Sequence, residues 1–427
     1  MKTALNRKYN TFVFIIIFVY MSMMFAKNIF NAEIIEIIEV FDSTATITSL
    51  VNLTYYVVYG IYQLFLVFLL ERINLKNYIV VTLSASSVLT ILIGVLGNMG
   101  VGMVALFIIF ALNGVLQAAF YAAGVRLTVK YLSKEKYMLT TKLYSIGQVG
   151  SLSLAYLVCS AFVAISRWDI PFTIAGILFF ISVITFAVLY NPTVKGILAL
   201  GHVSQENTKK SADRSIISVK TKNVEIVFMV IVCVMMLASN VCFYSINNWF
   251  SKILYEVHGV PKSFSILLSV SVSISVAIAT TTGITIYDKM KNMHVLAIGG
   301  FALSFVLALL LVFLYDKNVV ATIILCITFI SAICMAKGGY TGVTAYRIKN
   351  IIEPGKYSLI TNAMASFSAG CAPTLMSFVF ETFGWANSFI MVTVLCVITV
   401  VLGFAFMLFE RKLIFSYNDD KLLAKAL

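Results

Sequence analysis

Twelve long apolar stretches are the feature of this sequence that most restricts its fold. Each has about 20 residues or more, the length that an α-helix needs to cross the roughly 30 Å hydrocarbon core of a membrane. The apolar runs are continuous and do not alternate with polar residues, as the strands of a transmembrane β-barrel do. The stretches lie near 11–32, 46–70, 78–97, 100–123, 140–165, 170–191, 224–250, 264–287, 294–314, 319–345, 357–382 and 386–409. The sequence therefore predicts an all-α membrane protein with twelve transmembrane helices.

The composition agrees with a membrane protein and excludes most soluble classes. Of the 427 residues, 61% are apolar and only 11% are charged, whereas a soluble domain is typically about 25% charged. This chain has too few polar side chains to cover globular domains in water. A cytosolic enzyme and a disordered protein are therefore excluded. The net charge of +13 would point to nucleic-acid binding in a soluble chain. In a membrane protein it can instead reflect basic cytoplasmic loops, and the positions of the basic residues distinguish the two.

The basic residues are distributed very unevenly between the predicted loops. With both termini in the cytoplasm, 25 of the 31 Lys and Arg residues fall on the inside, four fall outside, and two lie within stretches. Such an excess of positive charge on one side is typical of cytoplasmic loops. It predicts cytoplasmic N and C termini and makes nucleic-acid binding unnecessary as an explanation. The four outside residues are Arg167, Lys252, Lys262 and Lys317.

The stretches fall into two sets of six with a basic polar interval between them. This predicts a first six-helix bundle over 1–191, a cytoplasmic linker over 192–223 and a second bundle over 224–427 that ends in a short cytoplasmic tail. The loop after the second stretch carries Glu71 and Arg72, and the equivalent loop after the eighth carries Asp288 and Lys289. An acid–base pair at the same place in both halves indicates an internal repeat.

These features together resemble transporters of the major facilitator superfamily. In that superfamily the loop acid–base pair clamps helix ends on the cytoplasmic side, so the resemblance implies a gating role for the pairs at 71–72 and 288–289. Arg126 and Arg347 lie near cytoplasmic ends of equivalent stretches in the two halves. We expect these two arginines to form inner-gate salt bridges or to extend toward the membrane interface.

Two segments resemble the organophosphate:phosphate antiporter family more specifically. The segment 113–117 (Asn-Gly-Val-Leu-Gln) is followed at a fixed distance by Arg126, and the segment 383–385 reads Phe-Gly-Trp. In the same register, Tyr20 and Lys27 match a helix 1 tyrosine and a substrate-binding arginine of that family, and Gln63 matches a lysine of its binding site. The resemblance implies that these three residues contact substrate.

The sequence also departs from that family where phosphate would bind. The family arginine of the seventh helix aligns with Phe243, and a family histidine aligns with Gln148. Bidentate bonds from two arginines suit a phosphate group, and this chain lacks them. Asn240 and Asn247 provide hydrogen-bonding groups in the seventh stretch instead. The fold assignment survives this difference, but recognition of phosphate does not follow from it.

Lys27 and Lys337 are the basic residues that topology leaves unexplained. A charged group within a span costs about 2.5–3.5 kcal/mol on insertion scales, which makes it a functional candidate. Lys27 is a predicted anion ligand, or alternatively a lysine that reaches the outer interface or pairs with Glu33. Lys337 is a predicted cavity residue, or alternatively half of a structural pair. Apart from Glu33 and Glu36 at the outer end of the first stretch, we find no embedded carboxylate, which favours exchange or facilitated movement over carboxylate-based proton coupling.

The sequence accordingly predicts a secondary transporter that moves a small organic anion, phosphorylated or carboxylated, by alternating access. The alternatives are a carrier or exporter of neutral or zwitterionic solutes and a transporter-like sensor. No catalytic constellation, nucleotide motif or metal-ligand spacing is visible, so we expect no enzymatic activity, no cofactor and no metal. We expect a monomer in a bacterial inner membrane, spanning it many times and contacting only its substrate and the lipid bilayer.

Overall fold

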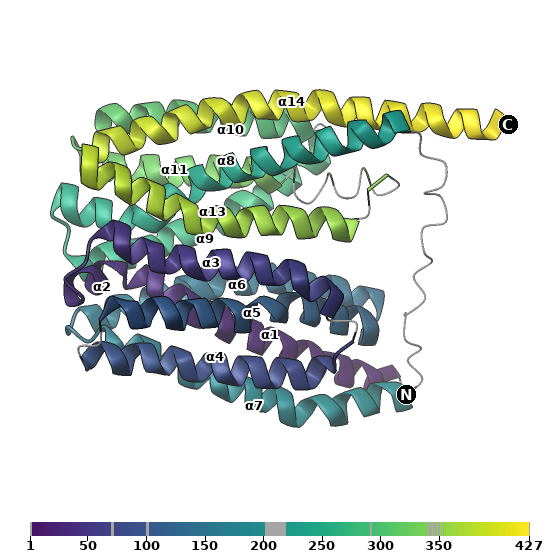
Figure 1. Cartoon of the computed structure of the whole chain (residues 1–427), viewed down its shortest axis with the longest axis horizontal. Coiled ribbons are helices and arrows are strands. Elements are labelled where there is room, and N and C mark those ends of the chain that lie inside the picture. Colours follow the sequence, from purple (N-terminus) through teal and green to yellow (C-terminus); the bar gives the residue numbers. More distant parts are fainter. Residues whose placement is uncertain are drawn as a thin grey trace. The chain divides into compact units, whose positions relative to one another are not determined.

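The computed structural model is all-helical over the residues that it describes, which are 2–69, 72–99, 102–200, 219–290, 293–338, 340, 344, 348, 351–352 and 354–426. Within these ranges it contains thirteen helices and no strand. The helices are α1 (Lys2–Ala32), α2 (Ile34–Val40), α3 (Ala45–Leu69), α4 (Leu75–Asn98), α5 (Met103–Tyr131), α6 (Lys134–Val163), α7 (Asp169–Ala199), α8 (Val219–His258), α9 (Lys262–Met290), α10 (Met293–Leu314), α11 (Val319–Gly338), α13 (Pro354–Phe383) and α14 (Trp385–Ala426), drawn in Figure 1.

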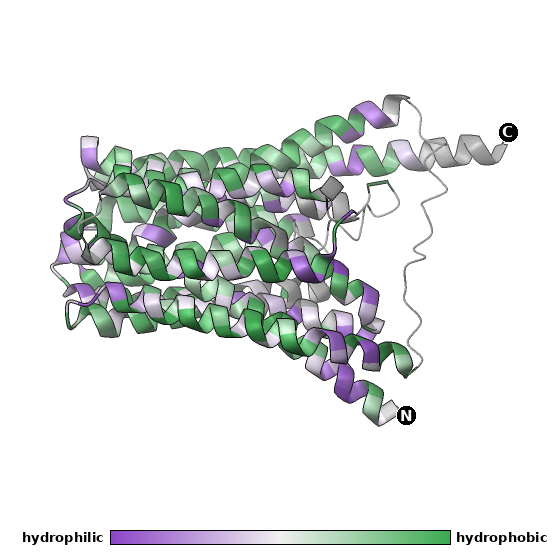
Figure 2. Cartoon of the chain, turned by 60° about the horizontal axis from the view of Figure 1, so that its bottom comes forward, coloured by the Kyte–Doolittle hydropathy of each residue, from purple (hydrophilic) through white to green (hydrophobic). Residues whose placement is uncertain are grey.

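Eleven of the helices in the described part of the chain are long and apolar enough to cross a membrane. The predicted stretch 46–70 corresponds to α3, which is helical but is not among these eleven. The count of twelve spans and the cytoplasmic termini therefore stay predictions. Figure 2 shows the hydrophobic residues along the middle of the helices, with the polar ones gathered toward their ends.

The helix boundaries differ from the predicted ones mainly at the ends. α14 continues to Ala426, well past the last apolar stretch, because a helix that leaves the membrane keeps its internal backbone hydrogen bonds in water. α7 runs to Ala199 and α8 begins at Val219, so helix occupies both ends of the predicted linker 192–223. Residues 201–218 of that linker lie outside the described residues.

The chain divides into two compact units. Unit 1 contains Met1–Thr208 and Val260–Ile274, and unit 2 contains Lys209–Gly259 and Ser275–Leu427. α9 is therefore shared between the units, with its first turns in unit 1. The predicted boundaries at 191 and 224 stay a prediction.

The same helix pairs pack together in both units. In unit 1, α1 packs on α6 and α7, while α4 packs on α5 and α7. In unit 2, α8 packs on α13 and α14, while α10 packs on α11 and α14. When the short α2 is left out of the count, each helix in these unit 2 pairs comes six helices after its counterpart in unit 1. The recurrence of four pairings is what an internal repeat produces.

Close helix packing in unit 1 depends on glycine at one of the predicted motifs. A Cβ atom on Gly114 of α5 would lie 2.6 Å from the backbone oxygen of Tyr55 in α3. A side chain at this position would push the two helices apart, as at other small-residue contacts between membrane helices. Part of the segment 113–117 therefore serves the α3–α5 contact, which fixes the position of Tyr55.

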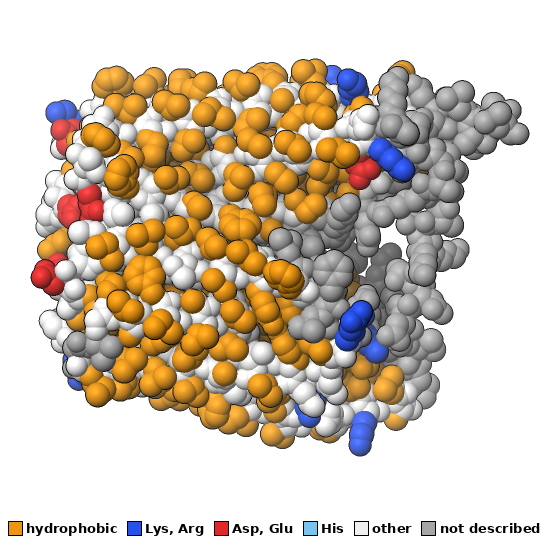
Figure 3. Space-filling model, viewed as in Figure 1, with side chains coloured by type: hydrophobic (Ala, Val, Ile, Leu, Met, Phe, Trp, Pro, Cys, Tyr) orange, Lys and Arg blue, Asp and Glu red, His pale blue; other side chains and the backbone are white. Residues whose placement is uncertain are grey.

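The surface of the helices is apolar, as expected for contact with lipid. Large side chains such as Phe14, Val81, Val188 and Phe313 are more than half exposed. Figure 3 shows hydrophobic side chains over most of the face in view and the charged side chains near helix ends. Exposed apolar area of this extent is unusual for a soluble monomer and fits a bilayer as the surrounding solvent.

Candidate functional site

Lys27 lies among three tyrosine rings within unit 1. Its ammonium nitrogen, on α1, is 5.1 Å from the ring centroid of Tyr55, 4.5 Å from that of Tyr56 and 5.0 Å from that of Tyr59. The three tyrosines are on α3, where Tyr59 lies four residues after Tyr55 and three after Tyr56, so that its ring is close to both along one side of the helix. Ammonium groups are attracted to aromatic faces within about 6 Å. Among the described residues, Lys27 has no acidic partner.

A small cavity adjoins Lys27 and is lined mainly by polar side chains. It spans about 10 Å³, which is room for one water molecule. Its lining comes from four helices of unit 1, α1, α3, α4 and α5. The lining residues are Ala26, Lys27, Asn52, Tyr55, Thr90, Ile93, Phe110, Asn113 and Gln117.

A chain of buried hydrogen bonds runs from the tyrosines into α5 and α4. The Tyr55 hydroxyl donates to Gln117 Oε1 at 2.7 Å, and Gln117 Nε2 donates to Ser86 Oγ at 2.9 Å. Ser86 Oγ in turn donates to Asn113 Oδ1 at 2.7 Å. Asn113 and Gln117 are both motif residues whose side chains the sequence alone did not place. The chain fixes the Tyr55 ring that faces Lys27.

Several residues of this site were not predicted from the sequence. They include Tyr55, Tyr56 and Ser86, and also Asn52, whose Nδ2 donates to Asn31 Oδ1 at 2.9 Å. The available signal was a polar residue inside an apolar stretch, which is costly unless it is partnered or functional. That signal does not say which polar residues of different helices meet, so it could not define the site.

We expect Tyr55→Phe to lower the stability of the protein measurably, because the substitution removes the hydroxyl that donates to Gln117 Oε1. A buried acceptor that loses its partner costs about 1–3 kcal/mol. Thermal unfolding in detergent should show a lower midpoint than the wild type. Tyr62→Phe is the matched control. The Tyr62 hydroxyl lies 3.3 Å from the Tyr78 hydroxyl and is not part of the hydrogen bonds that link Tyr55, Gln117, Ser86 and Asn113. Equal effects of the two substitutions would contradict the assignment.

Lys337 occupies a different environment in unit 2. Its ammonium donates to Asn240 Oδ1, and it lies 4.4 Å from the ring centroid of Phe243 and 6.0 Å from that of Tyr244. Asn240 is held in turn by a bond from its Nδ2 to the Met236 carbonyl at 2.7 Å. Phe243 is the residue that the sequence resemblance aligns with an arginine of the antiporter family, and the structure places the ammonium of Lys337, from α11, beside its ring.

The other predicted binding residues are spread over several places. Tyr20 is buried in a ring cluster with Phe120, Tyr121 and Tyr144, the last with ring centroids 4.7 Å apart. Gln63 is buried in α3, and the Gln148 side chain is exposed on α6. Asn247 Nδ2 donates to its neighbour Asn248 at 3.1 Å. None of these residues lines the cavity beside Lys27, and their binding roles stay predictions.

The predicted gating residues fall mostly at positions that the structure leaves undescribed. Glu71 and Arg347 lie outside the described residues, and the side chains of Asp288 and Lys289 do as well. The described members, Arg72 and Arg126, have exposed side chains. Their inner-gate roles stay predictions. Within the described part of the chain, no cluster of three or more potential ligands for a metal ion occurs.

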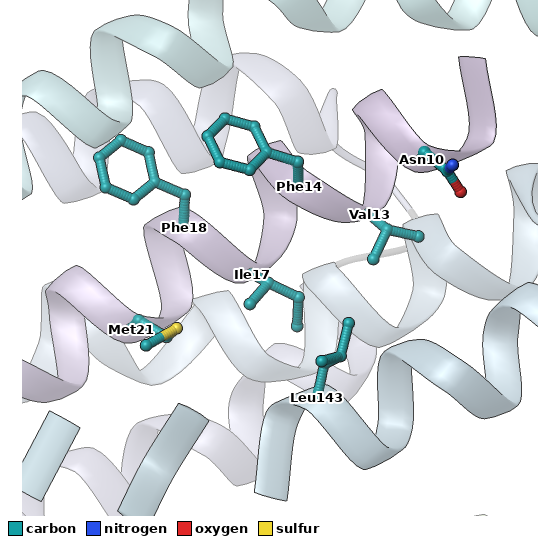
Figure 4. A pocket seen from close by; sticks show the side chains of 7 residues that line it. All are labelled: Asn10, Val13, Phe14, Ile17, Phe18, Met21 and Leu143. Carbon is teal, nitrogen blue, oxygen red and sulfur yellow. The ribbon is translucent and has the colours of Figure 1, made fainter. Parts of the chain in front are cut away.

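A second, larger cleft in unit 1 is apolar. It has a volume of about 340 Å³ and is lined by one face of α1 together with Leu143 of α6. Figure 4 shows Phe14, Ile17, Phe18 and Met21 following one another along α1. Asn10 closes one end, and its Oδ1 accepts a bond from Lys136 Nζ at 2.7 Å. The size is at the lower limit of small-molecule pockets.

Comparisons with known proteins agree with this architecture. A family model described as Major Facilitator Superfamily matches residues 16–350. A bacterial homolog of the human lysosomal transporter Spinster, inward-facing and unoccupied, is 13% identical, with 96% of this chain and 98% of that chain covered at a TM-score of 0.71. Its inward-facing occupied form is 14% identical, with 94% and 97% covered at 0.66.

A variant of the nucleoside transporter NupG is also similar in structure. It is 14% identical, with 92% of this chain and 98% of that chain covered, at a TM-score of 0.63. No curated protein matches the chain. Identities this low show a shared fold and nothing about the substrate.

Proposed function

The chain belongs to the Major Facilitator Superfamily, a superfamily of membrane transporters, and within it we propose that the protein is a secondary transporter of a small organic anion. One observation carries the proposal: Lys27, on a helix long and apolar enough to cross a membrane, has no acidic partner among the described residues and adjoins a polar cavity. Membership of the antiporter family that the sequence motifs resemble is part of this proposal.

The energetics of Lys27 favour an anionic ligand. A charged side chain at membrane depth costs about 2.5–3.5 kcal/mol, and cation–π contacts return about 0.5–2 kcal/mol of such a cost. The three tyrosine rings therefore hold the ammonium without neutralising it. A carboxylate or phosphate group would supply the missing opposite charge and a charge-assisted hydrogen bond.

Polar groups beside Lys27 would help to recognise the rest of the solute. The cavity presents the side chains of Asn52, Asn113 and Gln117 together with the Thr90 hydroxyl. Amides and hydroxyls suit hydroxyl or carboxylate oxygens. The cavity as it stands admits one water, so a solute must displace these side chains or enter in another state of the transport cycle. Lys337 of unit 2 stays a separate candidate for contact with an anion.

The rest of the proposal follows from the superfamily. Alternating access, in which the halves of a transporter move to expose the site to each side in turn, would carry the anion by exchange or facilitated movement. We propose that the protein acts as a monomer in a bacterial inner membrane. A carrier of neutral solutes is the second candidate, because the cavity lining has more amide and hydroxyl groups than charges.

A ligand screen on the purified protein tests the proposal. Thermal shifts should be larger with carboxylated and phosphorylated metabolites than with neutral sugars, nucleosides or amino acids of similar size. Counterflow in proteoliposomes then shows whether a ligand is carried. Stabilisation by neutral solutes alone would support the second candidate. Binding of an anion without any counterflow would instead indicate a sensor.

A further inference from the structure

Glu33 carries a carboxyl group that is completely enclosed within unit 1. The residue directly follows α1 and precedes α2, and its exposed fraction is 0%. Neither carboxyl oxygen has a conventional hydrogen-bond donor among the described residues. The Cys159 thiol of α6 lies beside it, but a thiol is a weak donor. A carboxylate in such a place would lack both water and a cation, so the neutral acid is the form that fits.

The charged groups around Glu33 strengthen this conclusion. Glu36 of α2 and Asp169 at the start of α7 both face it with like charge. The nearby cations are engaged elsewhere, since Arg167 binds Asp169 at 2.9 Å and Lys262 of α9 binds Glu36 at 3.1 Å. Burial, and then the negative charges of Glu36 and Asp169, raise the pKa of Glu33 well above the ordinary glutamate value. Among the described residues, the Cys159 thiol opposes this shift by donating weakly to the carboxylate.

The residues next to Glu33 hold the first turn of α9. On the α2 side, both Glu36 and Glu39 bind the Lys262 ammonium. On the α6 side, Ser160, which follows Cys159, donates from its hydroxyl to the Ser263 carbonyl at 2.8 Å. All of these residues belong to unit 1. α9 then continues as one helix into unit 2.

We propose that Glu33 is a proton-binding site, and that loss of its proton releases the first turn of α9 from α2 and α6. Ionised Glu33 cannot stay enclosed, so its segment must move to reach water. α2 has only seven residues and carries both Glu36 and Glu39, so moving it breaks the contacts of these two side chains with Lys262. The inference is independent of the substrate.

The direction of the pH dependence follows from linkage. The held arrangement binds a proton at Glu33 that the released arrangement, with Glu33 in water, gives up at its ordinary pKa. The held form, in which α2 and α6 contact the first turn of α9, is therefore fully stabilised by this proton at low pH. That stabilisation is lost as the pH rises through the raised pKa. Between the two pKa values, the ratio of held to released protein falls about tenfold per pH unit. Because burial raises the pKa of Glu33 well above the ordinary glutamate value, the transition should lie above the pH at which a glutamate in water titrates.

Trp168 offers a built-in probe of α2. Its ring centroid is 5.8 Å from that of Phe41, the residue that directly follows α2. We expect the tryptophan emission of the full chain in lipid nanodiscs to shift reversibly as the pH rises from 5 to 9. The shift should be absent in Trp168→Phe, which identifies its source, and absent in Glu33→Gln, which keeps the emission of the held form throughout. Asp42→Asn, an acidic residue of the same segment, is the control that should keep the transition.

A second variant keeps the proposal testable if Glu33→Gln does not fold. Lys262→Gln leaves Glu33 in place and weakens the held form, so the transition should move to lower pH. An absent wild-type transition would overturn the proposal. So would an unchanged transition in Glu33→Gln, or an unchanged midpoint in Lys262→Gln. Failure of the anion screen affects none of these outcomes, since they do not use a substrate.

Discussion

Replacing Lys27 with alanine is expected to lower the affinity for the transported anion by a factor of about 10 to 100, and to lower counterflow with it. The estimate rests on the value of a hydrogen bond to a charged group, about 1.5–3 kcal/mol. The substitution leaves the tyrosine rings in place, so the loss reports the charge. Isothermal titration in nanodiscs with the best anion from the ligand screen measures the effect, and proteoliposome counterflow measures its consequence.

Two matched variants make this result interpretable. Lys317→Ala removes an exposed lysine, 68% of whose side chain is accessible, and should leave affinity unchanged. Lys27→Arg keeps the positive charge and should retain more affinity than the alanine variant. Equal transport by the wild type and Lys27→Ala would contradict the role of Lys27 as an anion ligand, whatever the substrate proves to be. A loss in Lys337→Ala of similar size would show that Lys337 also contributes to the affinity for the anion.

Removing one partner of a buried pair in unit 2 is expected to cost about 3–5 kcal/mol of stability. His294, in the first turn of α10, has Nε2 2.8 Å from Oε2 of Glu410 in α14, and 4% and 0% of these residues are exposed. His294→Phe removes the imidazole from this contact and leaves the Glu410 carboxyl buried. Chemical unfolding of the purified protein in detergent should show the loss as a lower midpoint.

The double variant separates a broken pair from a damaged core. His294→Phe combined with Glu410→Leu removes both polar groups, and replacing a buried pair by apolar residues is often neutral or stabilising. We therefore expect the double variant to be clearly more stable than His294→Phe alone. If the two single losses simply add in the double variant, the side chains act independently and the pairing is not what stabilises this contact.

The class of the protein could be predicted from the sequence, because the signals are local. An apolar run of about 20 residues specifies a membrane helix by itself. The family match confirms the superfamily, and the repeated helix pairings in the two units agree with the internal repeat. Lys27 also stood out in the sequence, since a single charge within an apolar run is visible without knowing its neighbours.

The composition of the site could not be predicted in this way. Tyr55, Ser86 and Gln117 lie on three different helices, and only their contact makes them a hydrogen-bonded chain. The motif residue Gly114 proved to serve helix packing, which no spacing rule reveals. The alternative pairing of Lys27 with Glu33 is not what the described residues show, because the lysine faces tyrosine rings and the glutamate is enclosed without a cation.

The sequence by itself determined that the chain is a bundle of membrane helices with two related halves and rare embedded charges, because hydropathy and charge are properties of each segment. Only the tertiary structure decided which charges are partnered. Lys27 is surrounded by π faces, Lys337 is bound to an amide, and Glu33 is shut away from water. The reason is that the free energy of a charge depends on the groups within a few ångströms, and folding brings those groups from helices far apart in the chain.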